Sequence, residues 1–168
     1  YDDFPSIGPD DDFAQVDFDK VPEGILHRCR LDLSRKSVQT ERISNRTCEF
    51  AMVNPQRQGL SARYAWMAVT ERESGNDPLQ AIQKLDLATG STHTWSAAPR
   101  GFVSEPLMVR RPGADSEDDG WVLDLVWNGA RASSDLVILD ARDLSEVAVL
   151  ELPLAVPHGL HGSWAGAS

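Results

Sequence analysis

Three residues that could support a metal ion recur at a regular interval along the chain. Glu49, Glu105 and His161 follow one another at intervals of 56 residues. A neutral imidazole supplies a nitrogen ligand to a metal ion, and a nearby carboxylate can accept the other ring N–H and so fix the tautomer. The equal spacing is partly fortuitous, since the intervening loops differ in length, but the three positions are equivalent within a sequence repeat. They indicate either metal support or the polar lining of a channel.

The repeat consists of three similar hairpin segments. Each has a β-type run ending in Leu-Asp, a short polar turn, and a second run rich in Val, Thr or Trp, which is typical of paired strands. The Leu-Asp pairs begin at Leu31, Leu85 and Leu139, which gives two intervals of 54 residues. The hairpins themselves cover residues 26–43, 81–97 and 135–152.

Two further pairs of matched runs complete each repeat unit. Residues 48–55 resemble 104–112, and residues 62–70 resemble 120–128. Units of four strands and about 50 residues are typical of the blades of a β-propeller. Residues 77–87 could form a short helix by their apolar spacing, but their alignment with a β-branched run favours a strand. A β-sandwich is the alternative fold, and it does not explain the equal intervals.

The sequence therefore predicts an all-β chain that forms a partial arc of a β-propeller, with about two complete four-stranded blades and parts of two others. Inner strands converge on the axis of a propeller, so Glu49, Glu105 and His161 are expected to face one channel. The expected units are an acidic connecting segment (1–23), the outer two strands of a blade (24–44), two complete blades (45–98 and 99–153), and the inner strand of a further blade with the metal-ligand motif (154–168). A closed ring needs more blades, which we expect before Tyr1.

Composition restricts the possible partners and compartments. The net charge is -10, and residues 1–23 hold eight acidic residues against Lys20 alone. Such a chain repels phosphate backbones, so we expect no nucleic-acid partner. We interpret the acidic start as a solvated loop, because Asp10–Asp12 lacks the glycine and late glutamate of a calcium loop. Cys29 and Cys48 match no zinc spacing and suit an intracellular protein with reduced thiols; a disulfide between them is the alternative.

Four stretches resemble the carotenoid cleavage oxygenases, the family that includes the retinal pigment epithelial membrane protein. The tail HGLHGSW (158–164) resembles their terminal His-Gly-Thr/Ser-Trp/Phe signature. Three further stretches are similar to other sequence blocks of the family and occur in the same order. They are CEFAMVNPQRQGLSARYAWM (48–67), GFVSEPLMVRRPGADSEDDGWVLDLVW (101–127) and SDLVILDARDL (134–144). The resemblance is nearest to the cyanobacterial apocarotenoid type, and it extends to lignostilbene dioxygenases.

This resemblance implies a seven-bladed propeller with an axial non-haem Fe(II) ion. Four histidines hold the ion in the family, and three glutamates orient three of them. Carried onto this chain, His161 matches the last histidine ligand, and Glu49 and Glu105 match two of the glutamates. The remaining ligands are expected in blades before Tyr1. We predict no ligand role for His27 and His93, which fall in outer strands, or for His158, where the family usually has an aromatic residue. Two other departures are Ala51 and Arg110, where the family commonly has proline.

The reaction that the resemblance implies is oxidative cleavage of a conjugated C=C bond. The substrate would be an apolar polyene or stilbene, with O2 as co-substrate and two carbonyl products. The substrate tunnel should be apolar, and Trp66, Phe102 and Trp164 are candidates for its lining, although packing between blades is the commoner role of such residues. We expect a cytoplasmic protein, and peripheral membrane contact by the full-length protein stays open.

The sequence also suggests two rival functions. A non-catalytic propeller that binds a protein or peptide needs neither an axial histidine nor matched glutamates, so Glu49, Glu105 and His161 favour the enzyme. A sialidase-like propeller is suggested by SEDDGW (116–121), but Trp121 directly follows the glycine and no second copy of the motif exists. We expect the isolated 168-residue chain to be inactive, because one imidazole binds Fe(II) weakly.

Overall fold

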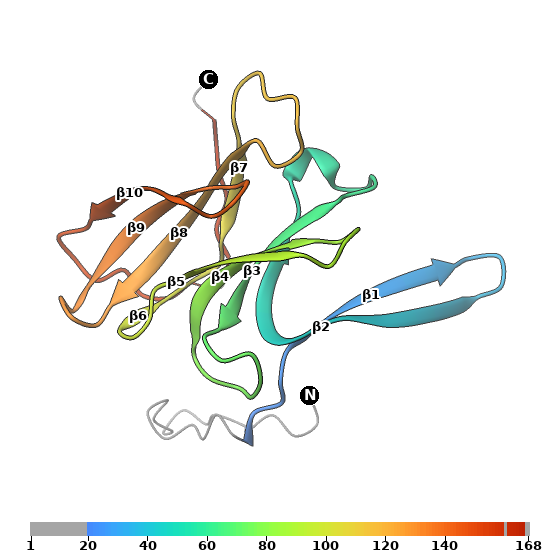
Figure 1. Ribbon diagram of the computed structural model, residues 1–168, viewed down its shortest axis with the longest axis horizontal. Coiled ribbons are helices and arrows are strands. Elements are labelled where there is room, and N and C mark those ends of the chain that lie inside the picture. Colours follow the sequence, from blue (N-terminus) through green and yellow to red (C-terminus); the bar gives the residue numbers. More distant parts are fainter. Residues whose placement is uncertain (1–19, 160, 167–168) are drawn as a thin grey trace.

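The computed structural model describes residues 20–159 and 161–166, and β-strands dominate its regular structure (Figure 1). The strands of the described residues form two five-stranded antiparallel sheets. The first has the order β1-β2-β3-β4-β5, with bounds Ile25–Asp32, Ser37–Met52, Tyr64–Thr70, Leu79–Asp86 and Thr92–Ser96. The second has the order β10-β9-β8-β6, and β7 also pairs with β8. Its strands are β6 (Gly101–Phe102), β7 (Leu107–Arg110), β8 (Gly120–Asn128), β9 (Ser133–Asp140) and β10 (Glu146–Glu151). The 3-10 helix η3, Pro55–Arg57, follows β2. The predicted all-β class is confirmed.

The strand β2 belongs to two hairpins at once. Its first part pairs with β1, from Asp32↔Ser37 to His27↔Arg42. Its last residues pair with β3, where Cys48 faces Val69 and Glu49 faces Ala68. The β1–β2 hairpin extends from the first sheet away from the rest of the fold (Figure 1). The division expected near residue 45 therefore lies inside one continuous strand.

The core lies between the two sheets and extends to the far side of the first one. Alternate residues of β3 point to opposite faces, as strand geometry requires. Trp66 and Ala68 pack with Ile82 against the second sheet. The intervening residues Met67 and Val69 pack into a second cluster on the opposite face. The segment 77–87 forms strand β4 rather than a helix, because a central strand buried on both faces suits its apolar residues.

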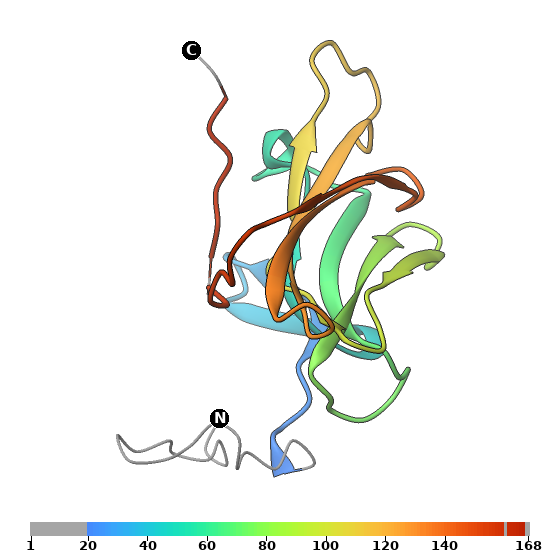
Figure 2. The ribbon, with the colours of Figure 1, turned by 90° about the vertical axis from the view of Figure 1, so that its left-hand side faces the viewer.

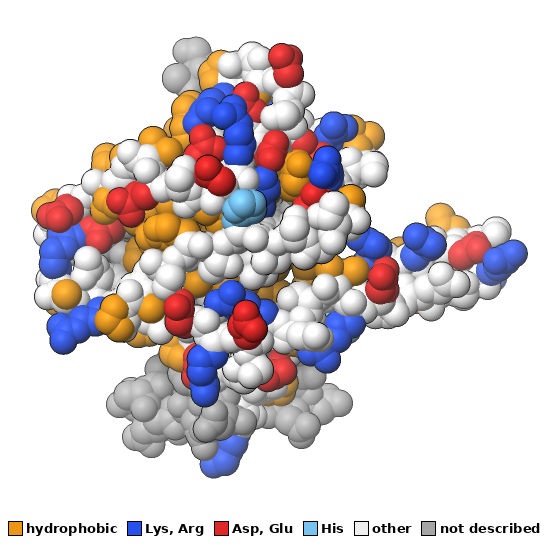
Figure 3. Space-filling model, viewed as in Figure 1, with side chains coloured by type: hydrophobic (Ala, Val, Ile, Leu, Met, Phe, Trp, Pro, Cys, Tyr) orange, Lys and Arg blue, Asp and Glu red, His pale blue; other side chains and the backbone are white. Residues whose placement is uncertain are grey.

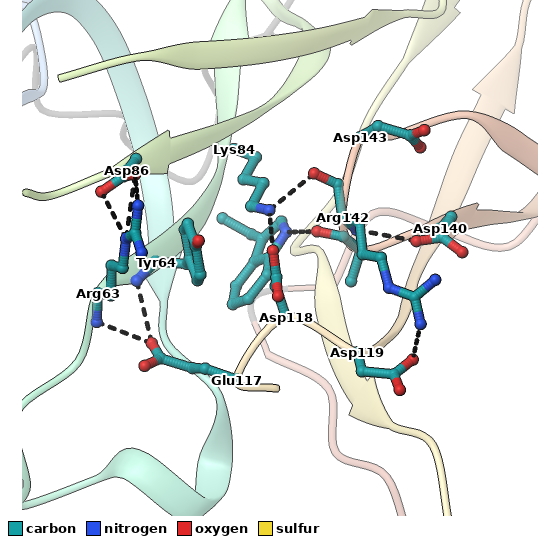
Figure 4. Close-up of polar contacts among 12 residues, drawn as sticks. Arg63, Tyr64, Lys84, Asp86, Glu117, Asp118, Asp119, Asp140, Arg142 and Asp143 are labelled. Atoms are coloured by element: carbon teal, nitrogen blue, oxygen red, sulfur yellow. Dashed lines mark hydrogen bonds and ion pairs between the residues drawn. The ribbon is translucent and has the colours of Figure 1, made fainter. Parts of the chain in front are cut away.

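A loop after β7 connects the two sheets through polar contacts (Figure 4). Glu117 accepts hydrogen bonds from the backbone amides of Arg63 (2.8 Å) and Tyr64 (3.0 Å). Lys84 of β4, which is 4% exposed, donates from Nζ to Asp118 (2.6 Å) and to the carbonyl oxygen of Arg142 (2.7 Å). The acidic residues of the SEDDGW segment thus bind the first sheet to the second.

The surface is mixed in charge and carries exposed apolar residues near both ends of the fold. Lys and Arg lie among Asp and Glu over the face in Figure 3, with apolar side chains between them. Exposed large apolar residues include Leu31, Leu33 and Val38 on the β1–β2 hairpin and Val147, Val149 and Leu150 on β10. Within the part of the chain that the structure describes, no helix has the length and hydropathy to cross a membrane.

The last described residues run as an extended segment along one side of the second sheet (Figure 2). Residues 152–159 and 161–166 form no strand, although an inner strand was expected over 154–168. Backbone bonds to Ser134 hold the start of this segment: the Leu152 amide donates to the Ser134 carbonyl (3.0 Å), and the Ser134 amide donates to that of Leu154 (3.1 Å). Beyond these bonds, no strand edge among the described residues pairs with the segment. Residues 1–19 of the acidic segment predicted over 1–23 lie outside the described residues.

Candidate functional site

Glu105 and His161 contact each other, as their matched positions suggested they could. Glu105 Oε1 lies 3.2 Å from His161 Nδ1, and Glu105 Oε2 accepts a hydrogen bond from the Gly162 amide at 2.6 Å. The Glu105 side chain is 20% exposed and that of His161 is 79% exposed. A carboxylate can only accept, so the contact favours the tautomer with the proton on Nδ1. This leaves Nε2 of His161 as the ring atom that could bind a metal ion.

A β-bulge places Glu105 where it can reach the tail. On one side Phe102 pairs with Trp127, and on the other Leu107 pairs with Leu123. Five steps along the bulged strand therefore span four along β8, which is the one extra residue of a bulge. The Ser104 amide within the bulge donates to Asp124 Oδ1 at 2.9 Å instead of to a strand neighbour. The bulge thereby turns the Glu105 side chain away from the ladder.

Glu49 lies beside a second bulge, in β2. The pairing shifts between Glu49↔Ala68 and Met52↔Trp66, which again leaves one extra residue on the inner strand. Phe50 inside this bulge has a φ of 56°, a region that costs free energy for a residue with a Cβ atom. Its ring meets the His161 ring edge-on at 6.2 Å between centroids. The two bulges thus bring Phe50 and Glu105 to the same histidine.

The Glu49 side chain takes a different position from that of Glu105. It is exposed, and it lines a hollow together with Glu23, Gly24 and His27. A Cβ atom on Gly24 would lie 2.8 Å from Glu49 Oε1 and 2.7 Å from the Cys48 carbonyl oxygen, so the close approach requires glycine there. Among the described residues, no hydrogen bond joins Glu49 to His161 or Glu105. The structure therefore brings together two of the three predicted residues.

The Glu105–His161 pair borders an apolar cavity of about 320 Å³. Its walls are mostly leucine side chains of β7, β8 and β9, joined by the glycines of the tail. The apolar part of the wall comprises Leu107, Leu123, Leu125 and Leu136. Such a surface suits an apolar ligand next to the polar pair.

The three proposed channel residues lie in different surroundings. Trp66 is fully buried between the sheets and donates from Nε1 to the Ala141 carbonyl oxygen at 3.1 Å. It therefore has the packing position that the sequence left open as its alternative role. Phe102 is partly buried on β6 opposite Trp127. Trp164 is 60% exposed on the extended tail.

Ser104 and Asp124 lie near the site and were not singled out from the sequence. His158 lies in the tail with Nδ1 3.2 Å from Ser104 Oγ, so Ser104 and Glu105 contact successive histidines. Asp124 on β8 is 2% exposed, and burial raises the pKa of its carboxyl to about 7. An acid at the centre of the apolar run WVLDLVW was the signal that could have revealed it.

Among residues 20–159 and 161–166, no three His, Cys, Asp or Glu side chains gather closely enough to hold a metal ion. The described residues thus offer His161 as a single candidate ligand with a carboxylate behind it. Further ligands would have to come from elsewhere.

Comparison with known proteins assigns the chain to a family. A sequence model of the family described as retinal pigment epithelial membrane protein matches residues 2–166. The apocarotenoid-15,15'-oxygenase of Synechocystis sp. is 42% identical over 167 residues, which cover 98% of this chain and 34% of that protein. The chain belongs to the carotenoid cleavage oxygenase family. Lignostilbene-alpha,beta-dioxygenase isozyme III of Sphingomonas paucimobilis is 31% identical over 157 residues, covering 85% of this chain and 32% of that protein.

Solved structures of the carotenoid cleavage oxygenase family share the fold. Cobalt-substituted Synechocystis apocarotenoid oxygenase matches with a TM-score of 0.94 and 41% identity, over 99% of this chain and 35% of that one. A chimera of that oxygenase with the retinal pigment epithelial protein gives a TM-score of 0.92 at 40% identity, over 98% and 35%. The chain spans about a third of the length of these relatives. The predicted partial arc of a seven-bladed propeller is thereby confirmed.

Proposed function

We propose that this chain is part of a non-haem Fe(II) dioxygenase that cleaves a conjugated C=C bond of a carotenoid, apocarotenoid or stilbene to two carbonyl products. The observation that carries the proposal is the Glu105–His161 contact beside an apolar cavity. The substrates that its relatives are named for support the choice of polyenes and stilbenes. The chain covers about a third of those relatives, so the activity is proposed for a longer protein of which it forms part.

The residues present could supply one ligand of an iron site and the carboxylate that orients this ligand. Glu105 occupies Nδ1 of His161, which leaves Nε2 available to a metal ion, and imidazole is a suitable ligand for Fe(II). A solved relative contains cobalt in place of its metal, which supports a metal site in the family. The other three histidines and a third glutamate would lie in the rest of the protein. Iron, when bound, supplies the activation of O2 that the cleavage requires.

The residues of this chain would orient the ligand and exclude water. Glu105, itself held by the Gly162 amide, would fix the imidazole from one side, and the edge-on ring of Phe50 would restrict its rotation. The apolar wall of the cavity would accept part of a hydrocarbon substrate, because burying apolar surface is favourable. Glu49 is proposed to orient another histidine in the same manner, which would require a partner from outside the described residues.

Product analysis of the complete iron-loaded protein tests this proposal. The protein would be incubated briefly with an apocarotenal and with a hydroxylated stilbene under 18O2. We expect two carbonyl products for each C=C bond broken, with the heavy isotope in the products. Short incubations are needed because aldehyde oxygens exchange with water. Absence of carbonyl products from both substrate classes, with iron bound and the protein folded, would favour the non-catalytic propeller instead.

A further inference from the structure

Asp124 is a buried acid whose environment is otherwise apolar. It lies at the centre of β8, where Val122 and Val126 on the same face belong to the core between the sheets. Its Oδ1 accepts the Ser104 amide hydrogen bond at 2.9 Å. Its Oδ2 is buried and has no hydrogen-bond partner among the described residues. Burying a carboxyl group with one oxygen unpaired costs free energy, so packing alone does not account for an acid here.

The hydrogen bond from the Ser104 amide accounts for the buried acid at position 124. Because the bulge inserts one extra residue between Phe102 and Leu107, the ladder with β8 leaves this N–H without a backbone acceptor. A buried N–H without a partner is itself unfavourable. The Asp124 side chain reaches across from β8 and supplies the missing acceptor. The Asp124 carboxyl group therefore takes the place of a backbone carbonyl as hydrogen-bond acceptor in the strand pairing.

The bulge that Asp124 supports carries both contacts to the tail. Ser104 Oγ lies 3.2 Å from His158 Nδ1, and Glu105 bonds His161 and the Gly162 amide. Among the described residues, these are the side-chain hydrogen bonds that join the bulge to the tail. A shift of the bulge would consequently move the carboxylate that orients His161.

We propose that Asp124 is a positioning residue whose buried side chain holds the Ser104 amide, fixes the bulge that carries Glu105, and so sets the contact between Glu105 and His161. The effect of Asp124 on metal affinity rests on the proposed function, because the orientation of His161 matters there only if this histidine binds the metal ion. The contact itself can be measured without any metal. In this role Asp124 acts through Ser104 and Glu105, although Asp124 and Ser104 also border the apolar cavity.

The charge state of Asp124 suggests which replacement is tolerated. Burial raises the pKa of its carboxyl to about 7, so the neutral acid is well populated at neutral pH. Asparagine has the same shape, is neutral, and retains an oxygen that can accept the Ser104 amide. Leucine fills similar space without an acceptor. The pair Asp124→Asn and Asp124→Leu therefore separates the hydrogen bond from the packing.

Metal affinity of the complete protein, stripped of metal and titrated with Co(II), is the first measurement. We expect Asp124→Asn to stay within about twofold of the wild-type affinity and Asp124→Leu to lose about tenfold, the lower end of effects of residues that orient ligands. In a Glu105→Gln background the Asp124→Leu change should lower the Co(II) affinity little further, because both residues act through one contact. Asp135→Asn, at a buried acid of β9 away from the bulge, is the control for general destabilisation.

Amide exchange of Gly162 in the metal-free protein is the second measurement, and it remains informative if the protein binds no metal. Asp124→Leu should speed this exchange about tenfold, as expected for losing one hydrogen bond, whereas Asp124→Asn should not. Asp124→Ala replaces Asp124→Leu if the latter does not fold. Equal exchange in wild type and in the leucine or alanine variant would overturn the proposal. So would additive losses of affinity with Glu105→Gln, or an asparagine variant as impaired as the leucine one.

Discussion

Glu105 uses both of its carboxylate oxygens on the tail, which a glutamine could not reproduce. An amide has one accepting oxygen, and its nitrogen would face another donor, either the Gly162 amide or His161 Nδ1. We predict that Glu105→Gln or Glu105→Ala lowers the Fe(II) affinity of the complete protein by about 10- to 100-fold. Glu49→Ala is expected to do the same through a different histidine. Metal titration checks this, with exposed Glu146→Gln as control; unchanged affinity in the Glu105 variants would contradict the role.

Asp124 gives stability a defined pH dependence. Its folded pKa is raised from 3.8 to about 7 by burial, so its contribution is fully present below its unfolded pKa and is lost as the pH rises through about 7. We predict that the free energy of unfolding of the wild type falls between pH 5 and pH 8 relative to that of Asp124→Asn. The expected difference is on the order of a few kcal/mol. Denaturant unfolding at both pH values measures it, and parallel profiles for the two proteins would contradict the assignment.

At the scale of elements, Lys84 connects β4 to two loops of the second sheet. Its ammonium group is buried, bonded to Asp118 and the Arg142 carbonyl oxygen, and 4.1 Å from the Tyr64 ring centroid. We predict that Lys84→Met lowers the free energy of unfolding by about 3 kcal/mol, because it leaves Asp118 without its cation. Adding Asp118→Asn should recover part of the loss. Denaturant unfolding checks both, and a loss below about 0.5 kcal/mol, typical of surface changes, would argue against the bridge.

The pairing of β7 with β8 depends on a glycine. A Cβ atom on Gly120 would lie 2.4 Å from the Val109 carbonyl oxygen, so the strands would have to separate. We predict that Gly120→Ala lowers the free energy of unfolding by about 2 kcal/mol through this overpacking. Gly159→Ala, which meets nothing within 4 Å, is the matched control. Equal unfolding midpoints for the two variants would mean that the strand pair adapts without cost.

The strands themselves followed from the sequence, but the bulges did not. Runs such as DLVILD and WVLDLVW have β-branched and apolar residues in the pattern of buried strands, so β8 and β9 could be predicted locally. The bulges at Phe50 and Ser104 depend on which residues of the neighbouring strand they face, and that register is not visible within one segment. For the same reason the repeat could match Glu49 with Glu105 but not foresee that only Glu105 meets His161.

At the scale of the whole molecule, the described chain offers one imidazole to a metal ion. No cluster of three potential ligands exists among residues 20–159 and 161–166, and His161 is largely exposed. We predict that the isolated 168-residue chain binds no stoichiometric Fe(II), because a single imidazole is a weak site. Metal titration of this chain tests the prediction. Tight binding of one iron per chain would show that it forms a complete site alone.

The most direct test of the account is the iron content of the complete protein purified with and without His161. Wild type should carry about one iron per chain, and His161→Ala should carry almost none, because that change removes a ligand together with the partner of Glu105. His93→Ala, an exposed histidine on β5, should retain the wild-type content. Stoichiometric iron in the His161→Ala protein would contradict the central claim that Glu105 orients His161 for the metal.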